Sequence, residues 1–212
     1  MSRYSGPRLR LFKRLGPLPG FGNNMYQKYQ KYKNVHRQDF VFKKKKKQKN
    51  QAYFLRLIEK QKLRYHYGLT EKNLAKYVRT AQKQKKSTGE ILLKNLEMRL
   101  DNIVFRCGFT STLPAARQLI THGHIFLNGQ KRTRPSISCQ PEDSITLHKK
   151  IHIHKKIQTS PYGKNGKKRP SPFFSFDVKN NSAKVHRSIE RRDVHLPVQE
   201  LFVVEYYSRR NG

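Results

Sequence analysis

Apolar residues recur with the period of an α-helix in the stretches that follow Ala52. On the first stretch, the residues that can share one apolar face are Leu55, Ile58 and Leu63. Gly68 is predicted to end this helix, because glycine readily adopts the left-handed conformation found after a helix. Thr70 is then expected to cap a second helix, since its hydroxyl can accept from an unpaired amide of the first turn.

A third helix is predicted from the capping-box spacing of Ser87 and Glu90. Its apolar positions continue at helical steps through Leu93, Leu96, Leu100, Ile103 and Val104. Gly108 is expected to end it, so the pattern predicts one long helix.

The segment after Gly108 changes to a shorter, mixed pattern. Thr112 and Pro114 are typical of a helix start. The apolar run Ile125–Leu127 then predicts a strand, and Asn128–Gly129 is the strongest signal for a two-residue hairpin. A further turn at 141–143 leads into alternating residues that end at Leu147. These features predict two short helices packed on a small antiparallel sheet.

The C-terminal part is predicted to form a hairpin around Asn180–Asn181 and a last strand at Leu201–Tyr207. The predicted fold class is therefore α+β, with a mostly helical N-terminal domain preceding the helix-and-sheet module. The predicted divisions are a basic arm (1–50), a helical domain (51–96), a module (97–160), and a basic loop with C-terminal strands that pack back on the body (161–212).

Charge changes this picture more than any other property. The 212 residues include 47 Lys and Arg against 13 Asp and Glu, so the formal net charge is +34. Such a chain would repel its own copies, which indicates a polyanion as the permanent partner. No stretch approaches the roughly 18 consecutive apolar residues that a membrane-spanning helix needs. We therefore expect no membrane contact.

Residues 1–50 are predicted to be an arm with little core of its own, whose removal leaves the rest folded. Proline and glycine interrupt it, and Lys43–Lys49 contains six lysines in seven positions. Tyrosines alternate with lysines at Tyr26, Tyr29 and Tyr32. These rings could stack on bases while the lysines contact phosphates, or they could form an ordinary helix face.

Neither a cofactor nor an enzymatic activity is expected. Cys107 and Cys139 do not form a CxxC pair, and their apolar neighbours favour buried free thiols in a reducing compartment. The histidines His148, His152 and His154 lie among lysines, where contact with phosphate or water is more common than metal binding. The sequence also lacks a phosphate-binding loop and the hydrolase and metalloprotease signatures.

One edge of the helix-and-sheet module gathers residues suited to a sugar–phosphate backbone. The third helix is expected to present Arg99, Asn102 and Arg106 opposite its leucines, whereas Asp101 is expected to be an internal partner of an arginine. The other members of this edge are Arg117, His122, His124, Lys131, Arg132 and Arg134. Arginine forks bind phosphate in a bidentate manner, so RNA is the expected ligand.

The residues LEMRLDNIVFRCGF, ARQLITHGHIFLNGQ and PEDSITL resemble the S4 RNA-binding domain. The flanking blocks RYSGPRLRLFKRLG, EKQKLRYHYGLTEKNL, STGEILLKNLEMRLDN and LFVVEYYSRR are similar to the small-subunit ribosomal protein S4 family of plastids and bacteria. The resemblance covers nearly the whole chain and is weakest across 23–50 and 149–175. It implies that the predicted module is an S4-type domain.

The resemblance also implies roles for individual residues. The characteristic positions of the domain are Arg99, Asp101, Arg106, Arg117, Gln118, His122, Asn128 and Gly129. The arm that threads into ribosomal RNA would contain Arg3, Tyr4, Gly6, Pro7, Arg8, Arg10, Lys13 and Arg14. Lys60, Lys62 and Arg64 line polar faces of the first helix and join the predicted RNA-binding set. Some bacterial members hold a metal in the arm, but no cysteine precedes Cys107 here.

The function implied is that of a structural protein of the small subunit. It would be a primary rRNA-binding protein that nucleates the 5′ domain of 16S-type rRNA and contributes to translational accuracy. The expected partners are that rRNA, protein five of the small subunit, and mRNA near its entry site, with no small-molecule substrate. The expected location is the plastid ribosome, with a bacterial-type cytoplasm as the alternative. Other candidates are an RNA-modifying or stress-related S4-domain protein and a histone-like DNA-binding protein.

Overall fold

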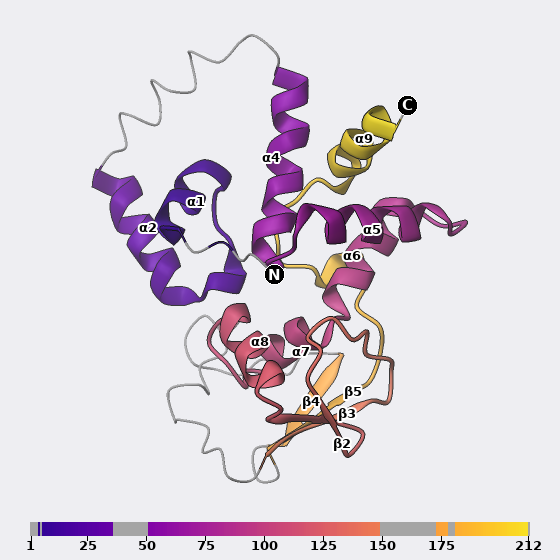
Figure 1. Cartoon of the computed structure of the whole chain (residues 1–212). Coiled ribbons are helices and arrows are strands. Elements are labelled where there is room, and N and C mark those ends of the chain that lie inside the picture. Colours follow the sequence, from indigo (N-terminus) through magenta and orange to yellow (C-terminus); the bar gives the residue numbers. More distant parts are fainter. Residues whose placement is uncertain (1–3, 5, 36–50, 149–172, 178–180, 212) are drawn as a thin grey trace. The chain divides into compact units, whose positions relative to one another are not determined.

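The computed structural model describes residues 4, 6–35, 51–148, 173–177 and 181–211 (Figure 1). The chain divides into two compact units. The helical unit contains Met1–Leu92 and His195–Gly212, whereas the sheet unit contains Leu93–Val194. Helices and one antiparallel sheet confirm the α+β fold class. Within the described residues, no helix is long and apolar enough to cross a bilayer.

The N-terminal part of the helical unit has a packed core. Helix α1 (Arg8–Leu15), the 3-10 turn η1 (Pro19–Phe21) and helix α2 (Asn23–Val35) follow one another. The ring of Phe12 is fully buried, with its centroid 5.7 Å from that of Tyr29, and α1 also packs against α4 (Gln51–His66). The prediction of an arm with little core is therefore wrong for these residues. The lysine run 43–49 lies outside the described residues.

The first two predicted helices are confirmed as α4 and α5 (Glu71–Gln82). Gly68 has a φ of +55° and directs the chain out of α4. The Thr70 hydroxyl accepts from the Asn73 amide at 3.3 Å, as an N-cap does. Leu63, Leu74 and Val78 are among the buried residues of this unit.

The third predicted helix is wrong in its continuity, because it is two helices. Helix α6 (Thr88–Glu97) ends and α7 (Leu100–Arg106) begins after a break in which Arg99 is extended. At the break, the Leu100 amide donates to the Ile137 carbonyl at 2.8 Å, and the Cys139 amide donates to the Met98 carbonyl at 2.8 Å. Backbone pairing with a segment nearly 40 residues away thus replaces the helical hydrogen bonds.

The sheet unit contains α8 (Leu113–Thr121) and an antiparallel sheet. Its strands are β1 (Ile125–Leu127), β2 (Gln130–Arg132), β3 (Ser144–Leu147), β4 (Phe174–Asp177) and β5 (Ser182–Val185), in the order β2-β1-β3-β5-β4. The Thr112 cap and both predicted hairpins are confirmed. Positive φ angles at Asn128 (+52°) and Gly129 (+75°) make the first hairpin turn a type I′ turn.

The predicted last strand at 201–207 is wrong, because α9 (Glu200–Asn211) is a helix. Val203 and Tyr207 are four residues apart and both buried, which places them on one helix face. The Tyr207 hydroxyl donates to Glu71 Oε1 at 2.8 Å, and Lys60 Nζ donates to the same oxygen at 3.1 Å. Thus α9 packs on α4 and α5 within the helical unit (Figure 1).

The buried ring of Phe12 provides a test of the N-terminal core. We expect Phe12→Ala to destabilise the packing of α1 on α2 and α4 by about 3–5 kcal/mol, because it leaves a cavity. Hydrogen exchange of the α1 and α4 amides in the full chain measures this loss of protection. Arg10→Ala, on the exposed side of the same helix, is the control and should leave protection nearly unchanged. Equal effects of the two substitutions would contradict the packed core.

Candidate nucleic-acid interface

The sheet unit exposes a polar face where α8, β1 and β2 come together. Along β1, Ile125 and Leu127 point into the core, so Phe126 points to the outer face. Phe126 pairs with Lys131 of β2 across the hairpin. The side chain of Lys131 lies over Gly123, where a Cβ atom would be 2.0 Å from Lys131 Cε. Any larger residue at position 123 would therefore displace the lysine from this face.

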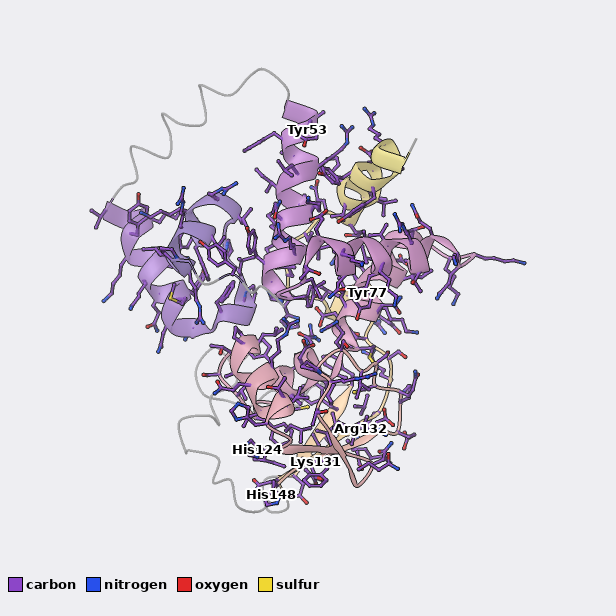
Figure 2. The ribbon with its side chains drawn as sticks, in the orientation of Figure 1. Tyr53, Tyr77, His124, Lys131, Arg132 and His148 are labelled. Carbon is purple, nitrogen blue, oxygen red and sulfur yellow. The ribbon has the colours of Figure 1, made fainter. Side chains whose placement is uncertain are left out.

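Histidines extend this outer face next to Lys131. The rings of His122 and His124 have centroids 5.8 Å apart, and the His148 amide donates to the His124 carbonyl at 2.9 Å. Figure 2 shows His124, Lys131 and His148 near the strands of this unit. Gln118, His122, Lys131 and Arg134 are exposed. This part of the predicted RNA-binding edge thus presents cations and hydrogen-bond donors to solvent.

Two of the predicted arginines lie elsewhere. The prediction that Arg99 and Arg106 face outward is wrong, because each is only 4% exposed. Arg99 Nη2 lies 2.9 Å from Asp101 Oδ2, and Arg106 Nε lies 3.0 Å from Glu97 Oε2. Asn102 is buried beside them and donates to the Glu97 carbonyl at 2.9 Å. The break before α7 turns these side chains inward, where carboxylates neutralise both arginines.

Arg117 belongs to the same internal network. Its Nε lies 2.7 Å from Asp101 Oδ2, and its side chain is 11% exposed, so the predicted outward position on α8 is wrong. Asp101 therefore binds guanidinium groups from both sides, through Arg99 and Arg117, and links α7 to α8. This confirms the expectation that Asp101 is an internal partner.

The hairpin residues Asn128 and Arg132 also make internal bonds. Asn128 Nδ2 donates to Asp143 Oδ1 at 2.8 Å, and its Oδ1 accepts from the Ser144 amide at 2.8 Å. These two bonds fix the β1–β2 turn against the start of β3. Arg132 is half-buried, and its Nη2 donates to Gln130 Oε1 at 2.6 Å. Asn128 thus stabilises the conformation of the hairpin turn.

A second cluster in the sheet unit joins Arg106 to Arg187, an arginine that the sequence-based set did not include. Arg106 Nη2 donates to the Asp193 carbonyl at 2.8 Å, and Arg187 Nη1 lies 2.9 Å from Asp193 Oδ2. Both guanidinium groups lie near the Phe173 ring, at 5.2 and 5.8 Å from its centroid. Burial raises the pKa of Asp193, but hydrogen bonds from Arg187 and from the Glu190 amide outweigh it and hold that pKa below its ordinary value.

In the helical unit, the predicted cations of the arm lie on the solvent side of α1. The exposed residues there are Arg8, Arg10, Lys13 and Arg14. Lys13 Nζ lies 3.6 Å from the ring centroid of Tyr32, and burial raises the pKa of Tyr29, which packs on Phe12. The tyrosines of α2 thus form a helix face with Tyr29 turned toward α1. Arg3 lies outside the described residues.

The predicted cations of α4 are mostly engaged within the unit. Lys60 is 4% exposed, donates to Glu71, and lies 4.5 Å from the ring centroid of Tyr206, so its predicted place on an outward face is wrong. Lys62 is paired with Glu59, and Arg64 lies over the Tyr65 ring at 5.3 Å. The contacts of Lys60 join α4 to α5 and α9, whereas those of Lys62 and Arg64 lie within α4. Together they leave little cationic surface there.

Sequence reasoning missed a cationic row that runs along α5 and onto its C-cap residue, Lys83. The exposed side chains at helical steps of four, three and four residues are Lys72, Lys76, Arg79 and Lys83. These steps place all four on one face of the helix. Their spacing alone could have revealed the row.

The cysteines match the expectation of buried free thiols. Cys107 and Cys139 are both buried and unbridged. Burial, with the neighbouring Cys139, raises the pKa of Cys107 far above its ordinary value. Burial also raises the pKa of Cys139 to about 12. Both therefore stay protonated and unreactive near neutral pH. His152 and His154 lie outside the described residues.

Known proteins resemble the chain over almost its full length. Residues 3–97 match the ribosomal protein S4/S9 N-terminal domain, and residues 98–145 match the S4 domain. A protein of Chaetosphaeridium globosum named small ribosomal subunit protein uS4c is 47% identical over 210 residues, which cover 99% of this chain and all of the relative. Proteins of the same name from Cyanophora paradoxa and Marchantia polymorpha are 46% and 45% identical, with the same coverage.

Asp101 allows a test of the buried network. We expect Asp101→Asn to destabilise the sheet unit by about 3–5 kcal/mol, because it leaves Arg99 and Arg117 without their shared carboxylate. Urea unfolding of the full chain, followed by hydrogen exchange in α7 and α8, measures the change. The exposed Glu142, which pairs with Lys184, supplies the control, and Glu142→Gln should have a much smaller effect. Similar effects would argue against the network.

Asp193 gives the sheet unit a defined acid sensitivity. Its pKa is lowered in the folded chain, so its ion pair contributes stability above the ordinary aspartate pKa of about 3.9, and this contribution is lost as the pH falls through the lowered value. We expect Asp193→Asn to have a lower free energy of unfolding than the parent at pH 6. The difference between the two proteins should become smaller as the pH approaches 3. Urea unfolding of both proteins between pH 6 and pH 3 measures this difference. A difference that stays constant over the range would contradict the role of the Asp193 ion pair.

Proposed function

The chain belongs to the ribosomal protein S4 family, and from this membership we propose that it is a structural protein of the small ribosomal subunit of a plastid, where it binds ribosomal RNA. The relatives from Chaetosphaeridium globosum, Cyanophora paradoxa and Marchantia polymorpha match the chain from end to end, and each carries the name of a chloroplast small-subunit protein, uS4c. The family is one of structural proteins.

The observation that carries the proposal is that several of the acidic side chains pair with cations inside the two units. Buried or half-buried carboxylates at positions 59, 71, 97, 101 and 193 are paired with cations inside the units. With only 13 acids against 47 Lys and Arg, this internal pairing leaves the exposed surface strongly positive. Such a surface favours RNA, because each phosphate that it neutralises releases condensed counterions.

The proposed contacts follow from what each unit exposes. In the helical unit we assign phosphate contacts to Arg8, Arg10, Lys13, Arg14 and the row on α5. In the sheet unit we assign RNA contacts to Gln118, His122, His124, Lys131, Arg132 and Arg134. The buried arginines Arg99, Arg106 and Arg117 would act indirectly, by holding α7 and α8 beneath this surface. Recognition would rest on RNA shape, because the deep groove of A-form RNA hides base edges.

Within the subunit, the proposed role is to bind early and bring rRNA helices together. Neutralising phosphates where helices converge lowers their mutual repulsion, which supports nucleation of the 5′ domain of 16S-type rRNA. The family resemblance also supports contact with protein five, a position near the mRNA entry site, and an effect on translational accuracy. End-to-end similarity to ribosomal relatives favours this role over an RNA-modifying enzyme or a DNA-packaging protein.

Lys131 provides the test of the sheet-unit surface. We expect Lys131→Gln to weaken binding to a plastid 5′-domain rRNA transcript and to reduce the slope of log K against log salt by about one. Filter binding of the full chain across a series of salt concentrations measures both. The control is Lys94→Gln, an identical charge change at an exposed site on α6. If both substitutions alter the slope equally, the assigned surface is wrong; if the parent shows no slope, rRNA binding itself is wrong.

A further inference from the structure

The outer face of the sheet carries an aromatic ring that the core does not use. The residues that face inward from β1 and β3 are Ile125, Leu127, Ile145 and Leu147, all buried. Phe126 alternates with them and is half-buried on the opposite side, between Lys131 of β2 and Thr146 of β3. By the alternation of the strands, Ser144, Thr146 and Ser182 share this face with it, so Phe126 is an apolar ring among polar side chains.

His148 lies beside this ring, and we call the two rings together the Phe126–His148 platform. Its imidazole stacks on Phe126 with centroids 5.9 Å apart and an angle of 28° between the planes. The His148 amide donates to the His124 carbonyl at 2.9 Å, which ties the end of β3 to the start of β1. Two flat rings are thus held nearly parallel at the sheet surface, in the offset arrangement that aromatic pairs prefer.

Charged residues on this face lie at different distances from the platform. Lys131 lies directly opposite Phe126, with its chain against Gly123. On the other side, the register runs from Phe126 through Thr146 and Ser182 to Asp177 of β4, three strands away. With strands about 4.8 Å apart, that carboxylate lies on the order of 14 Å from the platform. The charge directly beside the platform is therefore positive, which favours an anionic ligand there.

We propose that the Phe126–His148 platform binds an unpaired nucleotide of the bound RNA, with the base stacked on the rings and its phosphate on Lys131. This inference rests on the proposed RNA-binding function and specifies how one part of that surface reads RNA. An aromatic ring with an adjacent lysine suits a splayed-out base, because every base has a flat face and carries a phosphate beside it. Bases inside a duplex are already stacked on one another, so the platform selects single-stranded or bulged RNA.

The test compares two RNAs with the full-length chain and its Phe126 variants. The probes are a 12-nucleotide single strand with one 2-aminopurine and a blunt 15-base-pair RNA duplex. We expect Phe126→Leu to reduce affinity for the single strand about five- to tenfold and to abolish the fluorescence change of the 2-aminopurine. Affinity for the duplex and the salt slope for both RNAs should be unchanged, because the substitution removes no charge.

Two further variants complete the experiment. Phe126→Tyr retains the ring and should restore single-strand affinity and the fluorescence change. Lys131→Gln should instead weaken both RNAs together and lower both salt slopes. Equal losses for both RNAs in Phe126→Leu, or no loss at all, would overturn the platform. Because duplex binding by the parent is measured in the same series, such a result would leave the proposed rRNA-binding function standing.

Discussion

Internal neutralisation of arginine by carboxylate is the constraint on which the sheet unit depends. Asp101 is almost wholly buried and receives guanidinium groups from Arg99 and Arg117, so it links the start of α7 to α8. Glu97 neutralises Arg106, and Asp193 pairs with Arg187. A buried charge without its partner costs several kcal/mol, so the Asp101 pairs fix α7 against α8, and the Glu97 pair fixes α6 against α7. Several of the few acidic residues in this chain thus lie in the interior, where they neutralise arginines and position helices.

Features encoded by neighbouring residues could be predicted from the sequence. The Thr70 and Thr112 caps, the Asn128–Gly129 turn and the alternation along β1 each depend on residues within a few positions of one another. The break before α7 could not be predicted, because it arises from pairing with residues 135–139. The helix α9 was mistaken for a strand because its run of β-branched and aromatic residues is typical of strands, and only packing on α4 selects the helix.

The candidate site was predictable to the extent that exposure follows from local pattern. His122, Lys131 and Arg134 lie in or beside a hairpin whose register the turn determines, and they are exposed as expected. Arg99, Arg106 and Arg117 were misplaced because a helical wheel separates apolar from polar residues but does not reveal a buried carboxylate partner. Their resemblance to characteristic family positions is explained equally well by a structural role. The exposure of Phe126 on the outer face was not predicted, because its apolar neighbours Ile125 and Leu127 suggested that all three residues were buried.

The division of the chain has a consequence for the order in which its parts mature during translation. The helical unit is discontinuous: 1–92 must be joined by α9, and the whole of 93–194 is synthesised between them. The sheet unit therefore has all its residues available before the nascent helical unit has received the helix that supplies Val203 and Tyr207 to its core. Because domains tend to fold as units as they emerge, the proposed RNA-binding face of α8 and β1–β2 can form before the earlier part of the chain has received its final helix.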